Sequence, residues 1–157
     1  MSSIQLRIRR LPHCHSVPQY ASEGAAGMDL YAAIEEEKSL SPGERMRMPT
    51  GVAIEIPRGY QGQVVPRSGL ADRHGISLTN CVGTIDSDYR GEVQVLIINH
   101  GKETYTFKRG DRVAQLVLVA VPPVEIVEVD ELSTSARGAG GFGSTGIGLV
   151  SESKGNL

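Results

Sequence analysis

Two carboxylates and a tyrosine lie close together in NCVGTIDSDYRGEV, residues 80–93. Asp86 and Asp88 are two positions apart, and Tyr89 follows directly. A carboxylate can act as a general base, and an aromatic ring can stack against a flat group of a ligand. The same residues also suit a glycine-bounded hairpin whose aspartates bond to turn backbone. The pattern alone leaves both interpretations open.

A second stretch, VVPRSGLADRHG at residues 64–75, carries groups that bind anions. Arg67, Ser68 and Gly69 stand where an apolar strand ends and a short helix is expected. The planar guanidinium of arginine and the first N–H groups of a helix both suit phosphate. The alternative is an ordinary strand-to-helix turn that is capped by Ser68.

A third stretch, RGAGGFGSTG at residues 137–146, contains five glycines. Gly138 and Gly143 have the spacing of a phosphate loop, but the lysine of that motif is missing. Glycines can still free backbone N–H groups to wrap an anion, and a guanidinium, a ring and two hydroxyls would add contacts. Those four side chains are Arg137, Phe142, Ser144 and Thr145. The alternative is a flexible tail.

Three shorter patterns contain single polar residues. In AAGMDLYAA, residues 25–33, Asp29 is either a turn former or part of a metal shell. In RGDRVAQL, Gln115 interrupts an apolar strand and needs a partner, which is either backbone or ligand. His13 and His15 of HCH could bind zinc from an extended segment. A structural zinc usually needs four ligands, and the absence of a second cluster favours a solvated loop.

Apolar residues that alternate with a period of two dominate the rest of the chain. The segments at residues 51–57, 92–99 and 112–121 are rich in Val and Ile and are separated by Gly and Pro turns. Such segments predict an all-β sandwich or barrel. One short helix is expected at residues 68–75, and a short strand at VEIVEV, residues 124–129.

Length and composition limit the function classes. A chain of 157 residues suggests one domain, here residues 1–136, followed by an arm and frayed tail at 137–157. The net charge of −2 gives no broad electrostatic attraction to nucleic acid or a membrane. No apolar run has the length of a secretory signal or a membrane span. Cys14 and Cys81 are expected as free thiols in a reducing cytoplasm.

Taken together and in order, the five stretches resemble the five motifs of the trimeric dUTPases, and the resemblance covers about residues 20–146. It implies a jelly-roll-like β fold (a β-clip) with at most one short helix and a flexible Gly-rich arm. It implies a homotrimer with three shared active sites. It also implies Mg²⁺-assisted hydrolysis of dUTP to dUMP and pyrophosphate by water attack on the α-phosphorus. That reaction keeps uracil out of DNA and supplies dUMP for dTMP synthesis.

The resemblance also implies residue roles. Asp86 would activate the water, Asn80 would bind uracil together with the hairpin backbone, and Tyr89 would lie against the deoxyribose. Arg67, Ser68, Gly69 and Gln115 would bind the phosphates, and Asp29 would hold a water of the magnesium shell. In the arm, Phe142 would cover the uracil ring next to Gly143. Arg137, Ser144 and Thr145 would bind the terminal phosphate. The arm would reach a neighbouring subunit and become ordered mainly when nucleotide is bound.

Two rival classes share this pattern in part. A dCTP deaminase has the same fold but carries Ser where Gly69 stands, and it would release ammonia from dCTP. A structural or regulatory relative would have kept the jelly roll and is expected to have lost Asp86 or the glycine stretch. This sequence has Gly69, Asp86 and the glycine stretch, which favours the hydrolase.

Overall fold

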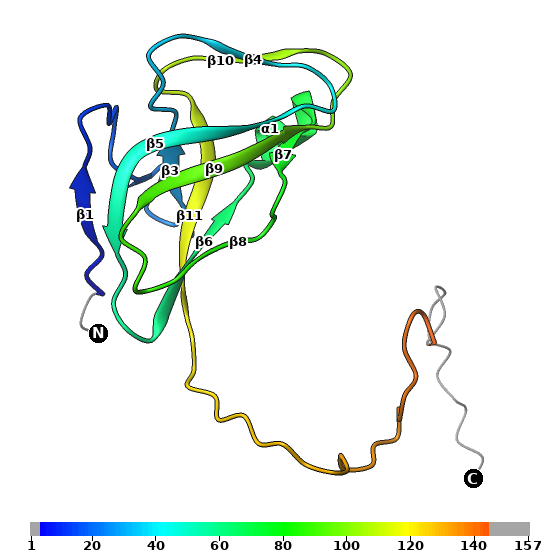
Figure 1. Ribbon diagram of the computed structural model, residues 1–157. Helices are drawn as coiled ribbons and strands as arrows, with labels where there is room; N and C mark the ends of the chain where they lie inside the picture. The colour runs from blue at the N-terminus through cyan, green and yellow to red at the C-terminus, as the bar shows by residue number, and fades with distance from the viewer. Residues whose placement is uncertain (1–3, 145–157) are drawn as a thin grey trace. The chain divides into compact units, whose positions relative to one another are not determined.

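Strands form nearly all of the regular structure in the computed structural model, which describes residues 4–144. One antiparallel sheet has the order β1-β5-β9-β7 and a second has the order β2-β3-β11-β6-β8. A third, two-stranded sheet pairs β10 with β4. In Figure 1, β5 (cyan) and β9 (green) lie side by side in front of β11 (yellow). The expected all-β fold class is confirmed.

The strand bounds place the predicted apolar segments inside the sheets. The four strands of the first sheet are β1 (Arg7–Arg10), β5 (Arg45–Glu55), β9 (Glu92–Asn99) and β7 (Ile76–Leu78). The second sheet contains β2 (Gln19–Tyr20), β3 (Met28–Tyr31), β11 (Arg112–Ala120), β6 (Tyr60–Val65) and β8 (Gly83–Ile85). The small sheet consists of β4 (Lys38–Leu40) and β10 (Tyr105–Phe107).

The alternation along β9 shows why these segments form a half-buried sheet. Val93, Val95 and Ile97 are buried, whereas Gln94 between them is exposed. They pack in one continuous cluster with buried side chains of β11, including Leu116. Burial of each aliphatic side chain contributes about 1.5–3 kcal/mol. The period of two read from the sequence is therefore the pattern of a sheet with one face on the core.

The predicted short helix is α1 (Ser68–His74). Its N-cap residue is Arg67, in an extended conformation and without a side-chain cap, so Ser68 does not cap the helix. Leu70 anchors it by burial. It ends at Gly75, whose φ of 67° lies in the left-handed region that favours glycine. In the described part of the chain no helix has the length and apolarity needed to cross a membrane.

Two local predictions were wrong. The segment at residues 80–93 is not a paired hairpin, because β8 pairs with β6 whereas β9 pairs with β5 and β7. The chain between β8 and β9 therefore passes from one sheet to the other. VEIVEV at residues 124–129 forms no strand and is exposed, because no strand of the described chain pairs with it.

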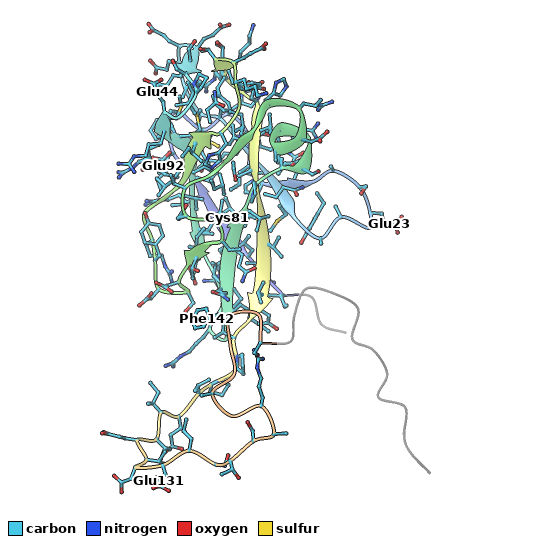
Figure 2. All side chains as sticks on the ribbon, turned by 90° about the vertical axis from the view of Figure 1, so that its right-hand side faces the viewer. Glu23, Glu44, Cys81, Glu92, Glu131 and Phe142 are labelled. Atoms are coloured by element: carbon cyan, nitrogen blue, oxygen red, sulfur yellow. The ribbon has the colours of Figure 1, made fainter. Side chains whose placement is uncertain are left out.

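The chain divides into two units after Pro123. The first contains all the sheets and α1. The second is described from Val124 to Ser144, and its labelled side chains, Glu131 and Phe142, are exposed (Figure 2). The boundary at residues 136/137 between a folded domain and an arm stays a prediction. The division after Pro123 does not test whether either part folds on its own.

Asn99 at the end of β9 yields a prediction about stability. Its side chain is fully buried, donates to the carbonyl oxygens of Leu40 and Glu103 at 2.8 Å each, and accepts from Gly101 N–H at 2.8 Å. Asn99→Ala would leave three backbone groups unpaired, at about 1–3 kcal/mol each when buried. We expect the free energy of unfolding to fall by about 1–3 kcal/mol, because only the bond to Leu40 O is fully buried.

Urea denaturation at one fixed protein concentration measures this loss. The matched control is Gln94→Ala on the same strand, where the side chain is exposed. We expect it to change the free energy of unfolding by no more than about 0.5 kcal/mol. A loss in Asn99→Ala as small as in the control would contradict the assigned role.

Candidate active site

The carboxylate of Asp29 on β3 is shared by three side chains. Its side chain is 2% exposed. Arg67 Nε lies 3.4 Å from Oδ1, and Arg112 Nη1 lies 3.1 Å from Oδ2. Gln115 Nε2 lies 3.4 Å from Oδ1. A buried carboxylate depends on such partners, because removing one partner of a buried ion pair costs about 3–5 kcal/mol. Predicted site residues from three distant stretches thus converge on one point.

An irregularity in β11 brings Arg112 and Gln115 to the same carboxylate. Residues three apart in a regular strand point to opposite faces of the sheet. The pairing of β11 with β3 shifts between Arg112 and Ala114, as in a β-bulge. Arg112 was missed as a site residue because regular alternation places it on the other face. Its presence inside RGDRVAQL was the one signal that could have found it.

The predicted anion-binding turn lies directly beside this cluster. Leu70 and Ala71 donate the first bonds of α1, both to Arg67 O, at 3.1 and 3.0 Å. The N–H groups of Ser68 and Gly69 therefore precede the helical hydrogen-bond ladder. Arg67 is held a second time, because its Nη1 donates to Arg112 O at 3.1 Å. A guanidinium and two backbone donors are thus fixed at the end of β6.

A cavity of about 310 Å³ lies beside the segment between β7 and β9, and Asn80, Asp86 and Tyr89 all line it. These are the residues that the sequence assigned to uracil, water and sugar. A Cβ at Gly83 would lie 3.2 Å from Asn80 Nδ2, so glycine leaves room for this amide. The volume falls in the range of small-molecule sites, about 300–1,000 Å³.

Tyr89 is fixed at both ends beside that cavity. Its backbone N–H donates to Asp86 O at 3.1 Å, and its hydroxyl donates to Glu92 O at 3.0 Å. The ring lies over Gly91, where any Cβ would collide with the phenol oxygen. The side chain is 46% exposed, so one part of the ring remains available to a ligand. Tyr89 is thus a preorganised surface that needs no rearrangement to meet a sugar or a base.

Glu92 is a second residue that the sequence analysis missed. Its carboxylate lines the same cavity and accepts from Gly51 N–H at 2.8 Å and pairs with His13 Nε2 at 2.7 Å. In the described structure His13 is thus the partner of an acid. Within the described residues no group of three or more His, Cys, Asp or Glu side chains could hold a metal ion. Both cysteines are free, as expected.

Asp86 and the arginine cluster lie near opposite ends of β6. Ile85 of β8 pairs with Gly62, so Asp86 lies towards the start of that strand. Arg67 follows the end of the strand, five residues beyond Gly62. At about 3.3 Å per residue the separation along β6 is roughly 15–20 Å. One chain therefore keeps the candidate base and the candidate phosphate cluster apart.

A second cavity, of about 1220 Å³, also reaches Asp86. Tyr60, Asp88 and Arg90 are among its other lining residues. Arg90 Nη1 donates to Ser87 O at 2.7 Å and so fixes the turn in which Asp86 stands. The carboxylate of Asp86 is thus presented between two hollows of the first unit.

The glycine stretch has turns of its own within the second unit. Gly140 N–H donates to Arg137 O at 3.1 Å, Arg137 Nε donates to Gly140 O at 2.7 Å, and Ser144 N–H donates to Gly141 O at 3.0 Å. Phe142 has a φ of 50° and a fully exposed ring (Figure 2). Gly143 also has a positive φ, of 87°. Thr145 lies outside the described residues.

The donor set fits magnesium in one way. Asp29, the acid that the sequence assigned to the metal, is buried among two guanidiniums and an amide. Mg²⁺ is often bound mainly by phosphates and waters, with few protein ligands. Both oxygens of Asp29 are paired within the chain, so a contact of Asp29 with magnesium through water stays a prediction. The site residues do not form a cage of their own in the described chain.

Comparison with known proteins settles the family. A family model described as dUTPase matches residues 14–146. The chain belongs to the dUTPase family. The resemblance of the five motifs to dUTPases is thereby confirmed. The match spans the Asp29 cluster, the segment around Asp86 and the glycine stretch, so the family assignment covers every candidate site residue.

Individual relatives agree with this dUTPase assignment. The deoxyuridine 5'-triphosphate nucleotidohydrolase of Anaeromyxobacter sp. is 58% identical over 130 residues, which cover 83% of this chain and 87% of the relative. The protein of the same name from Gloeobacter violaceus is 51% identical over 146 residues, or 93% of this chain and 99% of the relative.

Solved structures of phage dUTPases share the fold. A mutant dUTPase of Staphylococcus bacteriophage 80alpha, solved with dUpNHpp, has a TM-score of 0.82 at 28% identity and covers 91% of this chain and 99% of its own. A mutant dUTPase from phage phi11 of S. aureus, described with a structural Mg(II) ion, has a TM-score of 0.73 at 27% identity. It covers 81% of this chain and 97% of its own.

Glu92 gives a prediction on pH dependence. Burial alone would raise the pKa of Glu92, but hydrogen bonds from His13, Gly51 and Gln94 outweigh it and hold that pKa below the ordinary value of 4.5. An acid with a lowered pKa in the folded state stabilises the fold above its unfolded pKa, and this stabilisation is lost as pH falls through the folded pKa. The stabilisation should therefore fade below about pH 4.5.

Thermal unfolding between pH 7 and pH 3 tests this. Glu92→Gln should lower Tm at neutral pH, and the difference from the unsubstituted chain should shrink as the pH falls. Glu23→Gln, in the exposed loop between β2 and β3, is the control and should leave the pH profile unchanged. A difference in Tm that stays constant down to pH 3 would be evidence against a stabilising ionised Glu92.

Proposed function

We propose that the chain hydrolyses dUTP to dUMP and pyrophosphate. The main support for this proposal is that a member of the dUTPase family contains two preformed sites. One is the cavity lined by Asn80, Asp86 and Tyr89, and the other is the cluster of Arg67 and Gln115 on Asp29. The names of the bacterial relatives agree with this reaction.

The chemistry follows from what each site offers. Phosphoryl transfer depends on positioning and charge stabilisation more than on covalent groups of the protein. Asp86 accepts a proton from a water, and that water attacks the α-phosphorus. The bond from this phosphorus to the bridging oxygen breaks, and pyrophosphate leaves. Arg67, Gln115 and the N–H groups of Ser68 and Gly69 hold the phosphate oxygens. Bound magnesium supplies further neutralisation of the phosphate charge.

Selection of base and sugar takes place at the 310 Å³ cavity. Asn80 and the neighbouring backbone pair with the polar edge of uracil, and cytosine would leave those groups unpaired, which is a strong form of rejection. The ring of Tyr89, held over Gly91, lies against the sugar and leaves no room for a 2′-hydroxyl. A close approach of the backbone around Asn80 to the base would exclude the 5-methyl group of thymine.

The active site is completed by other copies of the chain in a homotrimer. The separation of Asp86 from Arg67 along β6 supports this, because a triphosphate held by one chain's cluster would lie far from that chain's base. Exposed apolar side chains in the second unit also support a homotrimer, since such side chains mark surfaces that a partner covers. They include Val124, Ile126 and Leu132, at 79%, 92% and 87% exposed.

In the trimer the glycine stretch closes over nucleotide that is bound to a neighbouring copy. Phe142 covers the uracil ring, and Arg137, Ser144 and Thr145 bind the terminal phosphate. Ordering such a segment costs about 1–2 kcal/mol per residue for the backbone, and base stacking can offset about 1–3 kcal/mol of this. Closure is therefore coupled to binding. The reaction keeps uracil out of DNA and supplies dUMP for dTMP synthesis, in the cytoplasm.

Release of pyrophosphate from dUTP, compared with dTTP, dCTP and UTP, tests the proposed reaction, and a lack of preference for dUTP would contradict it. Within that assay we expect Asp86→Asn to lower kcat by roughly 10²–10⁴-fold, the usual share of general base catalysis, while dUTP still binds. Asp88→Asn, two positions away in the same turn, is the control. If Asp86→Asn stays within a few-fold of the unsubstituted enzyme, the base lies elsewhere.

Ending the chain at Ala136 tests the arm. The hydrogen bonds of residues 137–144 that the structure describes stay within residues 135–144, so we expect nearly unchanged thermal stability. Turnover should be largely lost. Mixing this truncated chain with full-length Asp86→Asn chains should restore activity, because arm and base come from different copies. A mixture that stays inactive after verified subunit exchange would refute the shared site.

A further inference from the structure

Arg73 on the last turn of α1 reaches back to the predicted phosphate-binding turn. Its Nε donates to Gly69 O at 3.2 Å. A Cβ at Gly69 would lie 3.1 Å from Arg73 Nη2, so this guanidinium covers the side of Gly69 where any other residue would carry a side chain. Long helical side chains generally point towards the N-terminal end of their helix, which places the charge next to Ser68 and Gly69.

The charge of Arg73 has no counter-ion in the described chain. None of the ion pairs found among residues 4–144 involves it. The side chain is exposed. Of the five N–H donors that a guanidinium carries, Gly69 O takes one, so the others remain for a ligand. An exposed, unpaired cation beside two backbone donors is poised for an anion.

The pKa of Tyr105 is influenced by both Arg67 and Arg73. Burial raises the pKa of Tyr105, the carboxylate of Asp111 raises it further, and Arg67 and Arg73 both oppose that rise. The two guanidiniums therefore lie close enough to one phenol to influence its charge. The ring of Tyr105 is itself held at 4.7 Å, centroid to centroid, from the rings of both His74 and Phe107.

We propose that Arg73 is a further substrate-binding residue, which pairs with the pyrophosphate part of the nucleotide beside Arg67. The inference rests on the proposed dUTP hydrolysis. Attack at the α-phosphorus takes place at Asp86, so cations at the start of α1 face the part of the triphosphate that leaves. Glycine at residue 69 leaves the guanidinium of Arg73 room beside the turn.

Arg73→Gln keeps a donor for Gly69 O and removes the charge, whereas Arg73→Lys keeps the charge and removes the fork. Arg45→Gln on β5, which is also exposed and belongs to neither proposed site, is the matched control. Four quantities are measured for each chain. They are KM and kcat for dUTP, and the Kd for inorganic pyrophosphate and for dUMP by calorimetric titration.

We expect Arg73→Gln to raise the KM for dUTP and the Kd for pyrophosphate by about tenfold or more, as for a lost bond to a charged group. The Kd for dUMP should stay within about twofold. Arg73→Lys should recover part of the pyrophosphate affinity, and Arg45→Gln should match the unsubstituted chain.

Three results would overturn the inference. They are equal weakening of dUMP and pyrophosphate, a loss of thermal stability without a change in pyrophosphate affinity, and an Arg73→Gln chain that behaves like Arg45→Gln. The first two would mean that Arg73 only supports the turn through Gly69 O. Failure of the unsubstituted chain to release pyrophosphate from dUTP would instead refute the proposed reaction. The direct pyrophosphate titration still tests Arg73 in that case.

Discussion

A single buried carboxylate, Asp29, joins the ends of three strands of this molecule. It stands on β3, and its partners Arg67 and Arg112 come from the end of β6 and the start of β11. Removing either guanidinium would leave the buried carboxylate with weaker compensation, which costs more than losing a surface ion pair. The position of the Ser68–Gly69 turn, and with it that of α1, therefore depends on this pair of contacts.

Local patterns in the sequence predicted much of this arrangement. Alternating apolar residues located β5, β9 and β11, and the glycine at residue 75 marked the end of α1. The motif residues Asn80, Asp86 and Tyr89 indeed line one cavity. These predictions succeeded because burial on one face and helix termination are determined by residues close together in the sequence.

The features that failed depend on pairing between distant segments. Period and turn residues made residues 80–93 look like a hairpin, yet the partners of β8 and β9 are chosen by the sheets on either side. VEIVEV has strand composition but finds no partner in the described chain. Glu92 was missed because its bonds to His13 and Gly51 join residues far apart in sequence. Each case is a long-range contact that single-sequence periodicity does not encode.

The irregularity between Arg112 and Ala114 limits how this family can vary. Arg112 and Gln115 are three positions apart, and both reach Asp29 only because β11 contains one extra residue between them. Without that residue the ladder with β3 would be regular, and Arg112 would lie two positions from Gln115, still on the same face. A relative with a regular strand here would need its cation two positions from the amide instead of three. Gaps in a sequence alignment at this point and the position of the arginine should therefore change together.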